Sequence, residues 1–138
     1  MIKKILVALD GSKNSTRALS NAIQLAKQTD ASIVGISVIQ LFPTEMGLMR
    51  TIAGKALTKH YKHFMAIAKG MCTKKNVEFL DVIEYGDEGG TIVSFAQKNN
   101  FDLIVIGSRG MGKLKEIFLG STSNYVVHSS KIPVLIVK

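Results

Sequence analysis

Residues 102–123 read DLIVIGSRGMGKLKEIFLGSTS, and this stretch decides the fold. Leu103–Ile106 is a run of branched apolar residues, which is expected for a short strand covered on both faces. Glycines follow directly, and Gly120 with the hydroxyl residues behind it is typical of a helix start. A buried strand, a glycine-rich turn and a helix together make one unit of a parallel α/β sheet.

The same alternation of strand and helix runs along the rest of the chain. Runs rich in Val, Ile and Leu predict strands over Lys4–Leu9, Ser32–Ile39, Val77–Ile83, Leu103–Ile106 and Ile132–Val137. Apolar residues at helical spacing predict helices over Asn14–Thr29 with Ser12 as N-cap, within about Met46–Lys74 with a firm start near Gly54, around Ile92 and around Tyr125. The second of these helices has a predicted buried stripe of Ala53, Leu57, Phe64, Ile67, Ala68 and Met71, with His60 on the same side. Residues 1–138 are therefore predicted to form one α/β domain, a parallel sheet with helices on both faces.

Ligands bind such sheets at the carboxyl ends of the strands, where the strand order reverses. The segments that follow the predicted strands are Asp10–Ser12, Gln40, Tyr85–Asp87 and the residues from Gly107 onward. We expect a binding site to be built from these turns.

Composition and charge narrow the class of protein. Of the 138 residues, 46% are apolar and 20% are charged, which is typical of a globular chain rather than a disordered one. Neither a bilayer-spanning run of ~20 apolar residues nor a secretory signal is expected. The single Cys72 excludes an internal disulfide, so a reduced, cytoplasmic protein is expected. A formal net charge of +8 favours anionic partners such as nucleotides, nucleic acid or acidic surfaces.

The glycine-rich stretch has the features of an anion site. Glycine lets the backbone approach a ligand closely, and the first-turn N–H groups of a helix have no intrahelical partner. Gly120, Ser121 and Thr122 are predicted to direct amides and hydroxyls at phosphate oxygens. A glycine turn followed by an ordinary serine cap is the structural alternative.

Two common phosphate-binding motifs do not fit this stretch. The spacing from Gly107 to Gly112 and Lys113 matches the start of a P-loop, but Leu114 stands where Ser or Thr would hold magnesium. The dinucleotide fingerprint fails because Lys115 stands where its third glycine belongs. Neither motif is therefore assigned.

The spacing Gly107-x2-Gly110-x9-Gly120-Ser121 resembles the nucleotide-binding motif of the universal stress protein family, in its ATP-binding subgroup. The resemblance covers nearly the whole chain. It includes the following segments: Ile5–Ser12, Tyr85–Asp87 with Ile92, Asp102–Gly107 and Lys131–Lys138.

The resemblance implies an adenine nucleotide alpha-hydrolase-like fold with strand order 3-2-1-4-5 and ATP, with Mg, bound beside the first and fourth strands. It implies ribose and phosphate contacts from Gly107, Gly110, Gly120 and Ser121, and an adenine pocket of Ala8, Leu9, Val38 and Ile106. Asp10 is expected near the ribose or a magnesium ion. A phosphate contact from Arg109 is our own inference from its charge and position. Nothing carries over to Leu41–Thr58.

Several other reactive side chains have ordinary explanations. Asp10 is a candidate general base, but a ligand acceptor or a loop-organising carboxylate explains it better. His60 and His63 lie three residues apart on a predicted helix, yet no third metal ligand is evident. Cys72 is expected to be a small buried apolar residue, and no catalytic arrangement surrounds His128.

The function predicted from the sequence is that of an ATP-binding sensor or regulator in stress response. A slow ATPase or phosphotransferase using the same pocket is the first alternative, and it would need a base that we cannot name. A nucleic-acid-associated protein is the second. The lysines at 55, 59, 62, 69, 74 and 75 favour it, but a solvated helix face explains them better.

The last predicted strand, Ile132–Val137, is expected to form a homodimer interface. Pro133 lacks an N–H group, which suits an edge strand, and an uncovered edge pairs readily with another chain. Two-fold pairing of such edges closes the assembly at two subunits. The family resemblance implies the same interface. A monomer whose short edge is guarded by Lys131 and Lys138 is the alternative.

Overall fold

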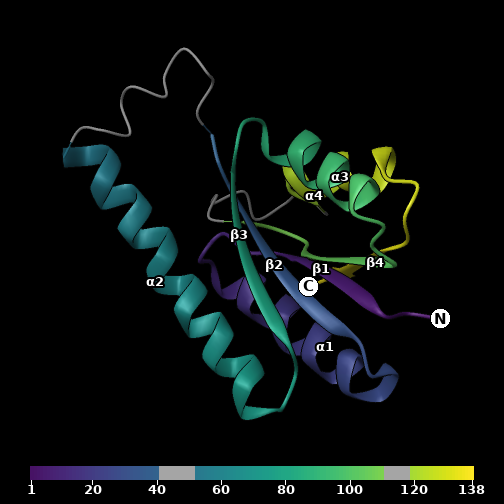
Figure 1. Cartoon of the computed structure of the whole chain (residues 1–138). Coiled ribbons are helices and arrows are strands. Elements are labelled where there is room, and N and C mark those ends of the chain that lie inside the picture. Colours follow the sequence, from purple (N-terminus) through teal and green to yellow (C-terminus); the bar gives the residue numbers. More distant parts are fainter. Residues whose placement is uncertain (41–51, 111–118) are drawn as a thin grey trace.

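A computed structural model describes residues 1–40, 52–110 and 119–138 of the chain (Figure 1). Its strands are β1 (Lys4–Ala8), β2 (Ser32–Ile39), β3 (Phe79–Tyr85), β4 (Leu103–Gly107) and β5 (Val134–Val137). Its helices are α1 (Lys13–Thr29), α2 (Ile52–Lys74), α3 (Glu88–Lys98) and α4 (Ser121–Ser129). The strands form one parallel sheet in the order β3-β2-β1-β4-β5. The predicted α/β architecture and its strand order are confirmed.

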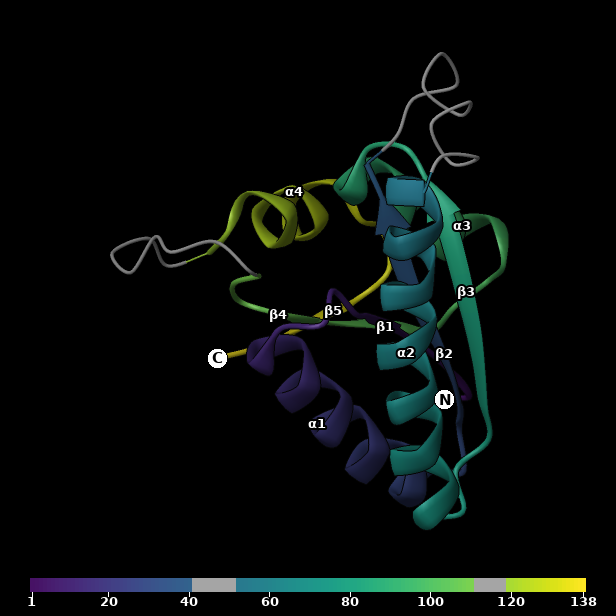
Figure 2. The ribbon, with the colours of Figure 1, turned by 90° about the vertical axis from the view of Figure 1, so that its left-hand side faces the viewer.

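The sheet is covered on both faces. Helices α1 and α2 lie on one side of it and α3 and α4 on the other (Figures 1 and 2). On β1, the side chains of Ile5 and Val7 belong to the core under α1 and α2, whereas Leu6 belongs to the core under α3 and α4. All three are 0% exposed. Burial on alternate faces explains why this strand is apolar at successive positions.

Two strands begin later than predicted because nearby residues bind their backbone. The N–H of Val77 donates to the carbonyl of Cys72 (3.0 Å) in the turn that ends α2, so β3 begins at Phe79. The Ser130 hydroxyl accepts from the N–H of Ile132 (3.0 Å) and donates to its carbonyl (2.8 Å), so β5 begins at Val134.

Of the first two helices, α1 has the predicted N-cap, and α2 begins slightly earlier than predicted. Ser12 caps α1 as expected, because its side chain accepts from the Ser15 N–H. Helix α2 begins at Ile52 rather than near Gly54. The earlier part of the predicted stretch from Met46, and residues 111–118 of the glycine-rich stretch, lie outside the described residues.

The predicted buried stripe of α2 is partly wrong. Leu57 and Ile67 are 37% and 53% exposed, and His60 is exposed as well. Ala68 is buried as predicted, and Phe64 and Met71 are partly buried against the core. Met65 and Cys72 are buried as well, because α2 lies over the β3 edge of the sheet and only a narrow face of the helix reaches the core. The side chain of Ala53 lies outside the described residues.

Cys72 has the environment that the sequence predicts. It is 0% exposed within the core under α1 and α2. Burial raises the pKa of its thiol to about 11. The residue therefore behaves as a small apolar side chain.

A search of the described helices for a membrane span was negative, since none is both long enough and apolar enough to cross a bilayer.

Candidate functional site

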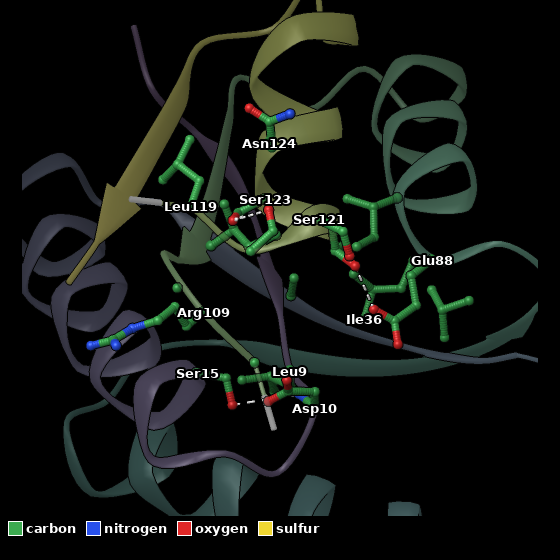
Figure 3. A pocket seen from close by; sticks show the side chains of 18 of the residues that line it. Leu9, Asp10, Ser15, Ile36, Glu88, Arg109, Leu119, Ser121, Ser123 and Asn124 are labelled. Carbon is green, nitrogen blue, oxygen red and sulfur yellow. Dashed lines mark hydrogen bonds between the residues drawn. The ribbon is translucent and has the colours of Figure 1, made fainter. Parts of the chain in front are cut away.

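A cavity of about 990 Å³ opens at the carboxyl ends of β1, β2 and β4, where the strand order reverses (Figure 3). Helices α2 and α3 contribute one residue and two residues to its wall, and the start of α4 forms its roof as Figure 3 is drawn. The lining residues are Ala8, Leu9, Asp10, Ser15, Ile36, Val38, Gln40, Tyr61, Glu88, Ile92, Ile106, Gly107, Arg109, Gly110, Leu119, Gly120, Ser121, Thr122, Ser123 and Asn124.

Every residue that the sequence analysis assigned to a nucleotide site lines this one cavity. They are Ala8, Leu9, Asp10, Val38, Ile106, Gly107, Arg109, Gly110, Gly120, Ser121 and Thr122. Their individual contacts with a ligand stay predictions. The sequence analysis did not assign Ile36, Tyr61, Glu88 and Asn124, among others. Two of them left a signal: Ile36 lies two residues before Val38 and so shares its face of β2, and Glu88 directly follows the predicted turn Tyr85–Asp87.

Asp10 organises the turn between β1 and α1. Its Oδ1 accepts a hydrogen bond from the Ser12 N–H (2.9 Å). Its Oδ2 faces the loop after β4, because a Cβ added at Gly110 would lie 2.5 Å from that oxygen. One carboxylate oxygen therefore holds the turn while the other faces the cavity.

Asn14 anchors the start of the loop after β4. This residue is buried, and its Oδ1 accepts from the Arg109 N–H (2.8 Å). Its Nδ2 donates to the carbonyl of Val137 at the end of β5 (3.3 Å). A Cβ at Gly107 would collide with the Asn14 side chain. The need for glycine at 107 thus comes from packing, whereas the sequence analysis related it to ligand approach.

The start of α4 presents free backbone donors to the cavity. Gly120 is the N-cap and provides no side-chain cap hydrogen bond. The first-turn amides that follow it have no intrahelical acceptor and lie at the positive end of the helix dipole. The Gly120 N–H itself donates to the Ser108 carbonyl (2.7 Å), so the prediction that this amide faces phosphate is wrong.

A hydrogen bond joins α3 to α4 at the cavity wall. The Thr122 hydroxyl donates to Glu88 Oε2 (2.7 Å), so its proton is not available to a phosphate. The prediction that this hydroxyl donates to a phosphate is therefore wrong. Asp87 caps α3 by accepting from the Gly90 N–H (2.9 Å). The Glu88 carboxylate is therefore held between two helix starts, where negative charge is stabilised.

Tyr61 reaches the cavity from α2. Burial raises the pKa of its phenol, and the carboxylates of Glu88 and Asp10 raise it further. The hydroxyl is therefore neutral at physiological pH and can both donate and accept a hydrogen bond. The ring also packs on Phe64, with 5.1 Å between centroids.

The cavity has two chemically different ends. In Figure 3, Glu88 and Arg109 are drawn on opposite sides of the other labelled lining residues, and the exposed Arg109 side chain extends away from them. The walls near the first end are apolar, with Val38, Ile92 and Ile106. The second end is lined by Arg109, whose charged group lies in the solvent at the edge of the cavity, and by the glycines of the loop. This polarity suits an elongated ligand with a flat apolar part and an anionic part.

The histidines contribute nothing to this site. His60 and His63 lie exposed on α2, and His128 lies exposed in the last turn of α4. Across residues 1–40, 52–110 and 119–138, no group of three or more His, Cys, Asp or Glu side chains could hold a metal ion.

Comparison with known proteins identifies a family. A family model described as "Universal stress protein family" matches residues 1–138. Universal stress protein YxiE of Bacillus subtilis is 32% identical over 148 residues, which cover 100% of both chains. The solved structure of universal stress protein UspA from Lactobacillus plantarum superimposes with a TM-score of 0.86, at 24% identity, over 99% of this chain and 97% of that one.

Two further solved structures of similar fold are described as nucleotide complexes. One is the universal stress protein from Archaeoglobus fulgidus in complex with dAMP, with a TM-score of 0.77 at 18% identity over 100% of this chain and 98% of that one. The other is a universal stress protein in complex with cAMP, with a TM-score of 0.73 at 23% identity over 99% of this chain and 96% of that one. At these identities the likeness establishes the fold alone, which is the adenine nucleotide alpha-hydrolase-like fold.

Proposed function

The chain belongs to the universal stress protein family, and from this premise we propose that it binds ATP, with magnesium, in the cavity above β1 and β4. The observation that carries the proposal is the start of α4, whose uncapped first turn and neighbouring Arg109 share one cavity with an apolar slot. Complexes of similar folds with dAMP and cAMP support it. Bound nucleotide would act as the signal in a sensor or regulator of stress response.

The apolar end of the cavity suits the adenine base. Ala8, Leu9, Val38 and Ile106 supply most of the wall, and Ile36 and Ile92 extend it. A flat aromatic base placed here leaves water and gains contacts with branched side chains.

The other end of the cavity suits the phosphates. The first-turn amides of α4 and the Ser121 hydroxyl offer hydrogen-bond donors, and Arg109 offers a positive charge. Gly110 carries no Cβ, and this lets the Asp10 carboxylate lie close to the loop that would meet the phosphates. Anions bind favourably at such helix starts.

Asp10 fits the magnesium that accompanies ATP. Magnesium prefers carboxylate oxygens and substrate phosphates and retains several waters, so one carboxylate beside the phosphates is sufficient. The Oδ2 atom of Asp10 faces the loop after β4, while Oδ1 is bound to the Ser12 N–H. Bound there, magnesium would neutralise part of the phosphate charge.

Slow hydrolysis of ATP is the second candidate function. The cavity holds two carboxylates, Asp10 and Glu88, and either could position a water molecule. Asp10 is nevertheless held by a backbone amide and Glu88 by Thr122, so neither is arranged as a dedicated base. We therefore place binding before catalysis.

We also propose that the protein is a cytoplasmic homodimer that pairs through β5. This strand is at one edge of the sheet, and Leu135 on it is 39% exposed. Pairing two β5 edges antiparallel would satisfy the backbone groups of both.

The binding proposal is tested by mass spectrometry and calorimetry. Denaturing mass spectrometry of freshly purified protein should detect co-purified ATP. In titration calorimetry, Gly120→Val should lose ATP binding while the fold survives, because a Cβ at Gly120 would have its nearest neighbours at 3.6 Å. Gly70→Val is the matched control, since a Cβ at this exposed position of α2 would meet nothing within 4 Å. ATP binding by Gly120→Val equal to that of the control would show that the assigned site is wrong.

A further inference from the structure

Glu88 occupies a position that helix capping does not explain. The cap of α3 is already filled by Asp87, whose carboxylate accepts from the Gly90 N–H (2.9 Å). The Glu88 side chain instead lines the cavity and accepts from the Thr122 hydroxyl on α4 (2.7 Å). This bond occupies only part of the capacity of a carboxylate, which can accept about four hydrogen bonds. Glu88 is thus held in place with acceptor capacity left for a ligand.

The surroundings of Glu88 indicate which part of a nucleotide it would meet. Figure 3 draws Glu88 on the side of the cavity away from Arg109, and both Glu88 and Ile36 line the cavity. Val38, Ile92 and Ile106 make that end apolar. These apolar walls suit a base, and the Glu88 carboxylate, unlike that of Asp10, has no magnesium assigned to it and would repel phosphates. A bound nucleotide would therefore be oriented with its base toward Glu88.

Glu88 differs in chemistry from two other polar side chains that line the cavity. Gln40 and Tyr61 also line the cavity, but an amide and a neutral phenol can each donate or accept a hydrogen bond. They adapt to either kind of group on a base. An ionised carboxylate can only accept. Of these three side chains, Glu88 is therefore the one that distinguishes a donor from an acceptor, and the other lining carboxylate, Asp10, is assigned to magnesium.

We propose that Glu88 determines base specificity by accepting a hydrogen bond from the exocyclic amino group of adenine. A base with a keto oxygen at that position would bring two acceptors together and leave both without a proton. A polar group that loses water without gaining a partner discriminates more strongly than a difference in shape. The inference rests on the proposed function, because it concerns the same cavity.

The experiment compares ATP with ITP, which carries a keto oxygen in place of the amino group. Calorimetry on the wild-type protein should give roughly ten- to a hundredfold tighter binding of ATP. In Glu88→Gln the preference should fall to about threefold or less, because the new amide can donate to the keto oxygen. The glutamine oxygen can still accept from Thr122, so the link between α3 and α4 is kept.

Asp87→Asn is the matched control. It removes one carboxylate from the adjacent position, outside the cavity lining, and asparagine is an equally good N-cap. Its ATP:ITP preference should equal that of the wild type. A drop in this control as large as in Glu88→Gln would show that net charge, rather than the Glu88 contact, sets the preference.

The remaining outcomes separate this inference from the proposed function. If Glu88 only joined two helices, Glu88→Gln would weaken both nucleotides by one common factor and leave their ratio unchanged, which would overturn the inference alone. Equal binding of ATP and ITP by the wild type would also overturn it. A wild-type protein that bound neither nucleotide would refute the proposed function as well.

Discussion

We predict that Asn14→Ala lowers the free energy of unfolding by about 2–4 kcal/mol. Asn14 is 8% exposed in the first turn of α1. Its side chain accepts from the Arg109 N–H (2.8 Å) and donates to the Val137 carbonyl (3.3 Å). One side chain thus ties the loop after β4 to the end of β5, and alanine removes both ties at once.

The magnitude follows from what each partner retains. The Val137 carbonyl keeps its bond from the Ser108 N–H (2.8 Å), so that loss is one net hydrogen bond of about 0.5–1.5 kcal/mol. The Arg109 N–H loses the acceptor that Asn14 provides, and an unsatisfied group costs about 1–3 kcal/mol. For a domain of this size, the sum corresponds to a fall in Tm of about 6–20 °C.

Urea unfolding followed by far-ultraviolet circular dichroism measures this loss. Asn21→Ala is the control, because Asn21 is an exposed asparagine of the same helix that donates only to the Arg17 carbonyl (3.0 Å). In the control variant, water can bind the exposed Arg17 carbonyl, so the free energy of unfolding should change by less than about 0.5 kcal/mol. Equal unfolding midpoints and m-values for the two variants would refute the reasoning, since the buried bonds would then contribute no more than an exposed one.

Three further predictions concern hydrolysis, assembly and the buried thiol. ATP turnover should be far slower than the ~10 s⁻¹ typical of enzymes; rapid single-turnover hydrolysis that Asp10→Asn abolishes with binding intact would favour the ATPase instead. Sedimentation at micromolar concentration should show a dimer for the wild type. Leu135→Lys should shift it toward monomer, whereas the control Leu80→Lys, on the opposite edge strand β3, should leave it a dimer. A clean 15.0 kDa species for the wild type would exclude the dimer. Because burial raises the pKa of Cys72 to about 11, only about one thiol in a thousand is ionised at pH 8, and a thiol reagent should react far faster in urea than in buffer; equal rates would contradict the buried environment.

The sequence predicts the elements well and their ends less well. Successive apolar residues on β1 are buried on alternate faces, so the pattern of a two-sided sheet was readable. The start of β5 could not be predicted from the pattern, because it depends on the Ser130 hydroxyl, which binds both the N–H and the carbonyl of Ile132. On α2, apolar character at Leu57 and Ile67 suggested burial, but the helix lies over a sheet edge that covers only a narrow face. Periodicity reports which residues could be buried, and tertiary position decides which of them are.

The strand order came from the family resemblance rather than from the pattern of elements. Alternating strands and helices are compatible with several orders of a parallel sheet. The resemblance also assigned Gly107, Gly110, Gly120 and Ser121 to the site. Arg109 and Thr122 were assigned because they lie next to these residues in the sequence. Tyr61 reaches the cavity from α2, and no spacing along the chain places it there, whereas Glu88 directly follows the predicted turn Tyr85–Asp87 but carried no assigned role. The contact between Glu88 and Thr122 joins residues 34 positions apart.

The motif residues also support the loop that they form, and this affects how their substitutions are read. Gly107 makes room for the buried Asn14, and the Gly120 N–H and the Ser123 hydroxyl both donate to the Ser108 carbonyl. A side chain at 107 would therefore disturb folding before it disturbed a ligand. At Gly110, by contrast, a Cβ would meet only the end of the Asp10 side chain, and at Gly120 its nearest neighbours would be at ordinary contact distance. Loss of binding at 110 or 120 with an unchanged unfolding midpoint is thus evidence about a ligand, whereas loss at 107 is evidence about packing.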